Sequence, residues 1–245
     1  MKGIPKIIHQ TWKSHILPDD LRRYRHSWKI HHPGWEYRFY DDEACRLFTK
    51  DHYPELLSLY ESYPKHIQRI DIFRYLVVNR CGGVYADMDM EFFRPIDSLL
   101  DEKTCAFSIE AHLTPQRQQE LGYAKPYQIG NCIFAAAANH RFFEMIIARL
   151  QQLADRPIST DADVEDTTGP RMLTRLYYQL SDAQKTGISI LPQIHLLSPK
   201  IYPNIFPFNT RMYGRHHCSG TWKDRTVRIS LKRLWIERNK LPFLW

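Results

Sequence analysis

The stretch RCGGVYADMDMEFFRP, residues 80–95, combines a glycine pair, an apolar run and two aspartates. The glycine pair is typical of a helix end, because a residue with positive φ closes many helices. The run VYADMDMEFF, residues 84–93, predicts a strand after that helix. Asp87 and Asp89 lie two positions apart in this run, so their side chains are expected to point to the same side.

Two carboxylates at a half-buried strand end are costly unless a cation neutralises them. Mg²⁺ or Mn²⁺ suits such a place, because these ions take few carboxylates and complete their shell with water and phosphate oxygens. The alternative is that the strand end reaches solvent and that both aspartates are hydrated. A second pair, Asp161 and Asp163, lies in the polar segment STDADVEDTT, where a solvated loop is expected.

The segment PKHIQRIDIFRYLVVNR, residues 64–80, predicts the helix before the glycine pair, with a proline in its first turn. Asp71 and Arg74 share one helical face with apolar residues, so they are expected on the buried side. They form either an internal ion pair or a polar pair that contacts ribose, sugar or phosphate oxygens of a ligand. Their place directly before the glycine pair and the aspartates favours the second interpretation.

The rest of the chain alternates strand patterns with helix patterns. IPKIIHQTW, residues 4–12, predicts a buried first strand, and WEYRFYDD, residues 35–42, predicts a second. This alternation predicts a single α/β domain over residues 1–245, with a largely parallel central sheet flanked by helices. Ligands of such sheets bind at the carboxyl ends of the strands, where both aspartates are expected.

The net charge of +7 suits acidic partners such as nucleotide phosphates, anionic lipid or nucleic acid. The segment at about 225–245 is basic and amphipathic, with Val227, Leu231, Leu234 and Trp235 near one helical side. It is expected either to touch an anionic membrane or to close the domain by packing on the core.

The chain has five cysteines with wide spacings and no CxxC motif, which argues against a disulfide framework and a zinc site. No apolar segment reaches the roughly 20 residues needed to span a bilayer, and the N-terminal residues lack the pattern of a signal peptide. The expected location is therefore the cytoplasm, with peripheral contact at the inner membrane face.

Five segments together resemble glycosyltransferase family 32, the DXD-containing sugar transferases, which are distantly similar to the glucosylating domains of large clostridial toxins. These segments are IPKIIHQTW (4–12), RIDIFRYLVVNRCGGVYADMDMEF (69–92), GNCIFAAAANH (130–140), TTGPRML (167–173) and HHCSGTW (216–222). The resemblance implies a GT-A fold, a UDP- or GDP-sugar donor, Mn²⁺ or Mg²⁺, and transfer with retention of anomeric configuration.

The resemblance also implies which residues bind the donor. Trp12 is expected to stack on the nucleotide base, and Tyr85 is expected to line the donor site. Asp71 and Arg74 are expected to contact the ribose and the sugar. Asn131 is a weaker candidate for the sugar pocket, since an amide at a strand edge is nearly as good an explanation.

A second set of residues is expected to bind the metal and the leaving group. The resemblance implies that Asp89 binds the ion directly, and that Asp87 contacts ribose or sugar and reaches the ion through water. It also implies that His217 is the third ligand. His216 competes for this last role because it is adjacent. Trp222 is expected to donate to the diphosphate. Asp87, Asp89, Trp222 and the Arg74 guanidinium would then stabilise the charge that develops on the leaving phosphate.

The implied function is retaining transfer of a hexose or N-acetylhexosamine from a nucleotide sugar to a glycan or lipid-linked glycan, in cell-surface polysaccharide or lipopolysaccharide synthesis. Same-face attack is favoured, because no carboxylate is identifiable as a nucleophile. One rival is a metal-dependent hydrolase of sugar nucleotides or diphosphates. The other is a basic nucleic-acid-binding module, which needs Lys and Arg interleaved with aromatic residues. Only the C-terminal segment has that pattern, so no nucleic-acid partner is expected.

Overall fold

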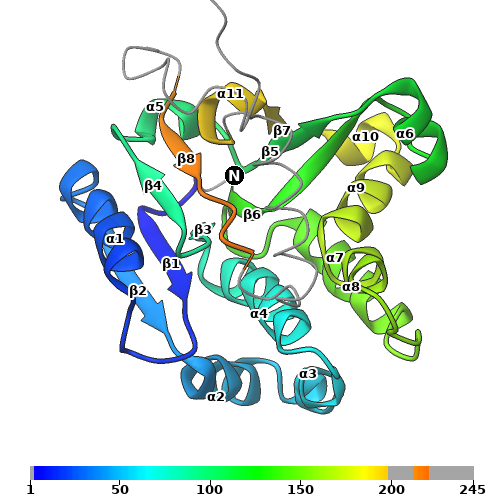
Figure 1. Ribbon diagram of the computed structural model, residues 1–245, viewed down its shortest axis with the longest axis horizontal. Coiled ribbons are helices and arrows are strands. Elements are labelled where there is room, and N and C mark those ends of the chain that lie inside the picture. Colours follow the sequence, from blue (N-terminus) through cyan, green and yellow to red (C-terminus); the bar gives the residue numbers. More distant parts are fainter. Residues whose placement is uncertain (1–2, 198–211, 221–245) are drawn as a thin grey trace, which may run out of the picture.

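The computed structural model describes residues 3–197 and 212–220. Their central sheet has six strands in the order β2-β1-β3-β6-β5-β7 (Figure 1). Strand β6 runs antiparallel to both neighbours, β3 and β5, whereas the other three pairings are parallel. The prediction of a largely parallel sheet is confirmed. The strands are β1 (Ile7–Thr11), β2 (Glu36–Tyr40), β3 (Gly83–Ala86), β5 (Cys105–His112), β6 (Tyr127–Ala136) and β7 (Ile188–Leu191).

A second, two-stranded antiparallel sheet joins β4 (Met90–Phe92) to β8 (Gly214–His216). The longer helices are α1 (Asp19–His31), α2 (Asp42–His52), α4 (His66–Cys81), α7 (Arg141–Gln152) and α9 (Pro170–Gln179). The shorter ones are η1 (Pro54–Leu56), α3 (Leu57–Ser62), α5 (Asp97–Leu100), α6 (Pro115–Leu121), α8 (Asp161–Thr167), α10 (Asp182–Lys185) and α11 (Gln193–Leu196).

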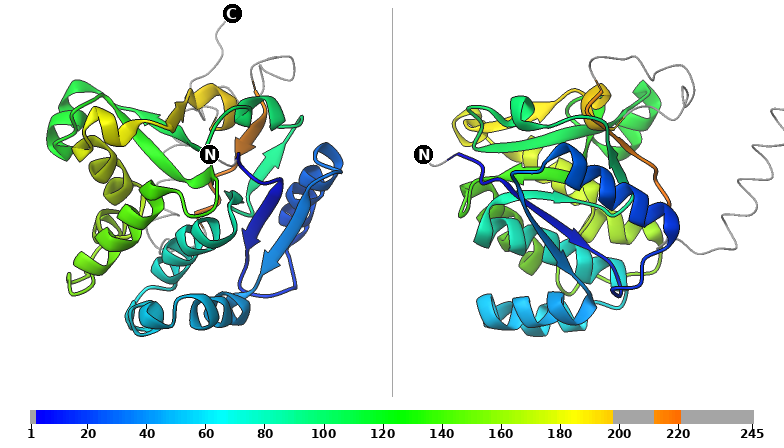
Figure 2. Two further views of the ribbon diagram at one scale, coloured as in Figure 1. Left: turned by 180° about the vertical axis from the view of Figure 1, so that it is seen from behind. Right: turned by 90° about the vertical axis from the view of Figure 1, so that its left-hand side faces the viewer.

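Helices cover both faces of the central sheet (Figures 1 and 2). On one face, α2, α4, α7 and α9 pack through an aromatic core that includes Phe73, Phe107, Phe134 and Phe143. On the other face, α1, α5, α11 and the small sheet pack through a second core that includes Trp28 and Phe92. Strand residues alternate between these two cores as the strand period requires. Burial on both faces leaves the strand ends as the place for a polar site.

The glycine pair between α4 and β3 is required by the backbone. Gly82 has a φ of 66° and Gly83 a φ of 98°, values that other residues rarely adopt. A Cβ on Gly83 would lie 2.6 Å from the carbonyl oxygen of Ile7 on the neighbouring strand. This tight crossing lets β3 run directly alongside β1, so the aspartates emerge beside the residues that follow β1.

Two local predictions were wrong. The run 84–93 is not one strand, because β3 ends at Ala86 and a turn separates it from β4. Asp161 and Asp163 lie in the first turn of α8 rather than in a loop, and the Asp163 side chain accepts from the backbone N–H of Thr160 at 2.7 Å. That hydrogen bond caps the helix, which explains an acid at this position.

Trp222 and the segment 225–245 lie outside the described residues, so their predicted roles stay predictions. Within residues 3–197 and 212–220, no helix combines the length and the apolarity needed to cross a bilayer.

Candidate metal and donor site

The aspartate pair occupies the turn between β3 and β4. The backbone N–H of Asp87 donates to Cys132 on β6 at 2.8 Å, and the N–H of Met90 donates to the carbonyl of Asp87 at 3.1 Å. Gln10 on β1 donates to the same carbonyl at 3.1 Å. The turn is therefore held from both neighbouring strands, which gives two carboxylates fixed positions without a regular strand beneath them.

Among the described residues, Asp87, Asp89 and His216 form a cluster that could hold a metal ion. One ligand atom from each lies within 4.8 Å of the others. Six ligands on one Mg²⁺ at about 2.1 Å from the ion lie roughly 3–4 Å apart, so small side-chain shifts would bring the three atoms onto one ion. Two carboxylates and an imidazole also suit Mn²⁺. The donor set therefore fits the divalent ion that the sequence predicted.

The histidine in this cluster is His216 and not His217. His216 Nε2 lies 3.0 Å from Asp89 Oδ1, whereas His217 Nε2 lies 2.8 Å from Glu91 Oε2. The His217 ring also stacks on Tyr24, with the ring centroids 4.1 Å apart. The prediction of His217 as the third ligand thus gives way to the neighbour that the sequence analysis left as its competitor.

The two aspartates have different charge environments. Burial alone raises the pKa of Asp89, but the hydrogen bond and charge of His216 and the hydrogen bonds of Ser219 outweigh it and lower the pKa to about 2. Burial raises the pKa of Asp87, although the charge of Arg74 opposes this effect. Asp89 is therefore the more readily ionised of the pair, as a direct metal ligand should be.

Asp71 and Arg74 lie on the buried face of α4, as predicted, and Arg74 links the helix to the aspartate turn. Its guanidinium lies 3.3 Å from Asp71 and 3.4 Å from Asp87, and it donates to the Asn131 carbonyl at 2.8 Å. Its Nε is buried, and no described residue accepts from it. A buried donor without a partner is costly, and an anionic ligand beside Asp87 would relieve that cost.

Asp71 has both carboxylate oxygens occupied. Asn131 donates to Oδ1 at 3.0 Å and Thr168 donates to Oδ2 at 2.8 Å. Burial raises the pKa of Asp71 to about 6, with Arg74 and Thr168 opposing the shift. This geometry favours Asp71 and Asn131 as residues that fix Arg74, rather than as residues that reach the donor themselves.

Tyr85 lies fully buried beneath the turn. Its hydroxyl donates to Asp87 Oδ1 at 2.9 Å and lies 3.1 Å from the Thr11 hydroxyl. The Arg74 guanidinium lies over its ring, 4.8 Å from the centroid. Tyr85 therefore sets the positions of a carboxylate and a cation at once. Its ring is fully buried, and its predicted place in the lining of the donor site stays a prediction.

Trp12 follows β1 at the carboxyl edge of the sheet, as predicted, and is half-buried. It packs beside Leu17, Leu21 and Met88. Its indole N–H is buried without an acceptor among the described residues. The ring thus lies at the same sheet edge as the aspartates, where a base could stack on it.

A further carboxylate, Glu110, lies on β5. Its Oε2 accepts from Gln128 at 2.8 Å, and burial raises its pKa. The pairing of β5 with β6 brings Gln128 beside it.

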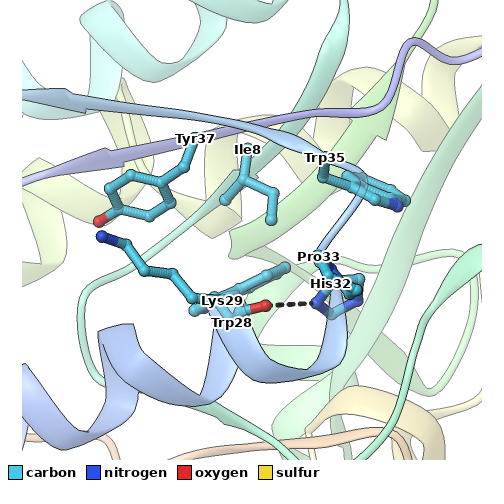
Figure 3. A pocket seen from close by; sticks show the side chains of 7 residues that line it. All are labelled: Ile8, Trp28, Lys29, His32, Pro33, Trp35 and Tyr37. Atoms are coloured by element: carbon cyan, nitrogen blue, oxygen red, sulfur yellow. Dashed lines mark hydrogen bonds between the residues drawn. The ribbon is translucent and has the colours of Figure 1, made fainter.

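A separate aromatic cleft of about 280 Å³ lies between α1 and β2, with Trp28, Lys29, Trp35 and Tyr37 among its walls (Figure 3). The Tyr37 hydroxyl donates to Gln10 at 2.9 Å, and Gln10 in turn donates to the carbonyl of Asp87. Gln10 is thus a supporting residue of the aspartate turn that the sequence analysis missed. Its signal was a polar side chain inside an apolar strand, where a buried amide needs partners.

The chain matches the family profile described as "Glycosyltransferase sugar-binding region containing DXD motif" over residues 18–106. Inositol phosphoceramide mannosyltransferase 2 of Schizosaccharomyces pombe is 28% identical over 96% of this chain and 62% of its own length. Mannosyl phosphorylinositol ceramide synthase CSH1 of Saccharomyces cerevisiae is 30% identical over 81% of this chain and 48% of its own length. The chain therefore spans less than two thirds of the length of both relatives.

Two solved structures share the fold. The PaToxG glycosyltransferase superposes with a TM-score of 0.53 at 20% identity, over 73% of this chain and 70% of that chain. The ligand-free glycosyltransferase domain of the YGT toxin superposes with a TM-score of 0.51 at 10% identity, over 77% of this chain and 80% of that chain. The predicted GT-A fold is confirmed.

Proposed function

Since the chain belongs to the glycosyltransferases that carry the DXD sugar-binding region, we propose that it moves a mannosyl group from a nucleotide-sugar donor to a hydroxyl of a phosphoinositol lipid head group. The names of the relatives support both the sugar and the acceptor class. Mannose is a hexose, as the sequence analysis expected. The lipid head group takes the place of the polysaccharide or lipopolysaccharide acceptor.

The observation that carries the proposal is the convergence of Asp87, Asp89 and His216 beside the Arg74 guanidinium. Asp89 and His216 would hold Mn²⁺ or Mg²⁺, and Asp87 would hold it directly or through a water molecule. Such an ion, when bound, neutralises charge on a leaving diphosphate.

The chain's own residues would do the remaining work. Arg74 has a buried Nε in need of an acceptor and lies against Asp87, so it is placed to donate to a phosphate oxygen at the same spot. Trp12 would stack on the nucleotide base, and Trp222 would add an indole N–H to the diphosphate. Buried donors that keep their positions through the reaction stabilise developing charge without reorganisation.

Retention of configuration is part of the proposal. Among the described residues, the candidate ligands of the ion are two aspartates and a histidine. A bound ion would engage all three, so none of them would be free to act as a nucleophile. Same-face attack, in which a leaving phosphate oxygen accepts the proton of the acceptor hydroxyl, needs no further protein base. Glu110 on β5, beside Gly130 of β6 and one residue from Asn131, is the carboxylate to test as a nucleophile instead.

The two rivals, a sugar-nucleotide hydrolase and a nucleic-acid-binding module, lead to different expectations. A sugar-nucleotide hydrolase would consume the donor equally fast with or without a lipid acceptor. A nucleic-acid-binding module would need no aspartate turn. Family membership favours the transferase over both. A lipid acceptor also places the reaction at a membrane surface, and the net charge of +7 suits an anionic leaflet.

The test is a donor screen with the full chain, Mn²⁺ and a phosphoinositol sphingolipid in detergent micelles. The proposal expects release of nucleoside diphosphate from a mannose donor to rise at least tenfold when the lipid is added, together with a lipid product heavier by one hexose. Equal release with and without lipid, and no hexosylated product, would establish the hydrolase instead.

A further inference from the structure

Helix α1 has a mainly basic outer side that no other element of residues 3–197 and 212–220 covers. Its buried side consists of Leu21, Tyr24 and Trp28. The exposed residues Arg22, Arg23, His26, Lys29 and Ile30 share the opposite side. This side has three cations, one of which, Arg22, is paired with the exposed Asp19 one turn earlier. In the right-hand view of Figure 2, α1 is the blue helix in front of the strands, and no other described helix or strand is drawn over it. We call these five residues the α1 face.

Apolar side chains stand out at both ends of the α1 face. Ile30 is 57% exposed at the C-terminal end, and Ile16, in the loop just before the helix, is 84% exposed. The fold therefore leaves more than half of the surface of each isoleucine in contact with solvent. Cations between protruding apolar side chains are the combination that binds an anionic lipid surface, where the charges attract acidic head groups and the apolar side chains enter the interface.

The α1 face lies next to the metal and donor site. The loop with Ile16 leaves the carboxyl end of β1 directly after Trp12. On its other side, α1 packs against β4, and Tyr24 stacks on His217 next to the metal-ligand candidate. A surface that touched the α1 face would therefore lie close to the site where the lipid head group must arrive.

Lys29 connects the α1 face to the aromatic cleft. Its ammonium lies 5.5 Å from the centre of the Tyr37 ring and forms part of the cleft wall in Figure 3. Tyrosine and tryptophan are typical of protein segments at the membrane–water boundary, because their rings are apolar and their polar atoms reach water. Trp35 and Tyr37 are both partly exposed and line the cleft beside the α1 face, although the Tyr37 hydroxyl itself bonds inward to Gln10.

We infer that the α1 face, together with Ile16, docks the protein on a bilayer that contains anionic lipid. A nucleic acid is the less suitable partner, because the protruding isoleucines would gain nothing from a phosphate backbone. The inference concerns docking and not catalysis, so it stands or falls separately from the proposed function.

The test is sedimentation of the full chain, without donor, with vesicles of phosphatidylcholine alone or with about 30% phosphatidylserine at low salt. The inference expects binding to the anionic vesicles only. Arg22→Glu/Lys29→Glu should weaken that binding at least tenfold. Arg141→Glu/Arg156→Glu, on exposed positions at and beyond α7, changes the net charge by the same amount and should weaken it less than threefold.

Ile16→Ser/Ile30→Ser separates a bilayer from other polyanions. Binding to anionic vesicles should fall at least threefold in this variant, whereas retention on a heparin column should not change. Circular dichroism of each variant establishes that the fold is intact. Three results would overturn the inference: no binding of the unmodified chain to anionic vesicles, equal losses in both charge variants, or vesicle binding that ignores the isoleucines and is competed away by RNA.

Discussion

His216 Nε2 lies 3.0 Å from Asp89 Oδ1 across the junction of β8 and β4. This contact joins the turn after β3 to a strand more than a hundred residues later in the chain, and it separates two adjacent histidines into different roles. One faces the aspartates, and the other pairs with Glu91.

The two histidines give the first prediction. His216→Ala should weaken Mn²⁺ binding at least tenfold, because it removes one of three clustered ligand groups. His217→Ala is the matched control and should change Mn²⁺ affinity less than threefold. Calorimetric titration with Mn²⁺ measures both. A larger loss for His217→Ala would return the ligand role to that residue.

Trp12 gives the second prediction. Trp12→Ala should weaken binding of the nucleoside diphosphate by about 1–3 kcal/mol, the usual scale of base–aromatic stacking. Trp35→Ala removes a half-buried indole that lines the aromatic cleft instead, and it should leave that affinity unchanged. Equal affinities for Trp12→Ala and the unmodified chain, in a folded variant, would reject the stacking role.

Asn131 gives the third prediction. It donates to Asp71 and accepts from Arg74. Asn131→Ala should lower the free energy of unfolding by about 1–3 kcal/mol, because Asp71 loses a buried hydrogen bond. Combining it with Thr168→Val, which removes the second donor to Asp71, should cost more than the sum of the single changes. Urea unfolding of the unmodified chain, the two single variants and the double variant measures this coupling. Strictly additive losses of stability would contradict the claim that Asn131 and Thr168 act on one carboxylate.

His9 gives a prediction on pH. Its ring is fully buried, with Nε2 2.9 Å from the Gly82 carbonyl oxygen, and burial lowers its pKa to about 4. The unfolded chain binds a proton near pH 6.5, so stability is complete above that pH and is lost as the pH falls toward 4. From pH 7 to pH 5 the loss is about 2 kcal/mol.

The control is His9→Gln, which cannot take up a proton. This variant is expected to be less stable than the unmodified chain at pH 7, but its stability should fall less between pH 7 and pH 5. Urea unfolding at both values measures the difference. Identical pH slopes for the two proteins would show that His9 is not the group that carries this dependence.

The parts that the sequence predicted well depend on local pattern. The helix before the glycine pair, the buried side of Asp71 and Arg74, and the position of Trp12 after the first strand all follow from periodicity within one segment. The α/β class and its largely parallel sheet follow from the order of such segments. These features need no knowledge of which strands pair.

The parts that it missed depend on pairing over long distances. Adjacent strand residues point to opposite sides. Which of His216 and His217 faces the aspartates therefore depends on the register of β8, and the pairing of His216 with Met90 fixes that register. The antiparallel course of β6 is likewise fixed by its neighbours, and it brings Asn131 to Asp71. The turn at Asp87 replaced the expected continuous strand because contacts from β1 and β6 hold it.

The most direct test of the central claim measures donor turnover by the unmodified chain and by Asp89→Asn across a Mn²⁺ titration, with circular dichroism as the check on folding. The account predicts turnover that needs the ion and falls about a hundredfold or more in the variant, since a charge-stabilising element is lost. Full turnover by folded Asp89→Asn, or full turnover of the unmodified chain in excess EDTA, would contradict it.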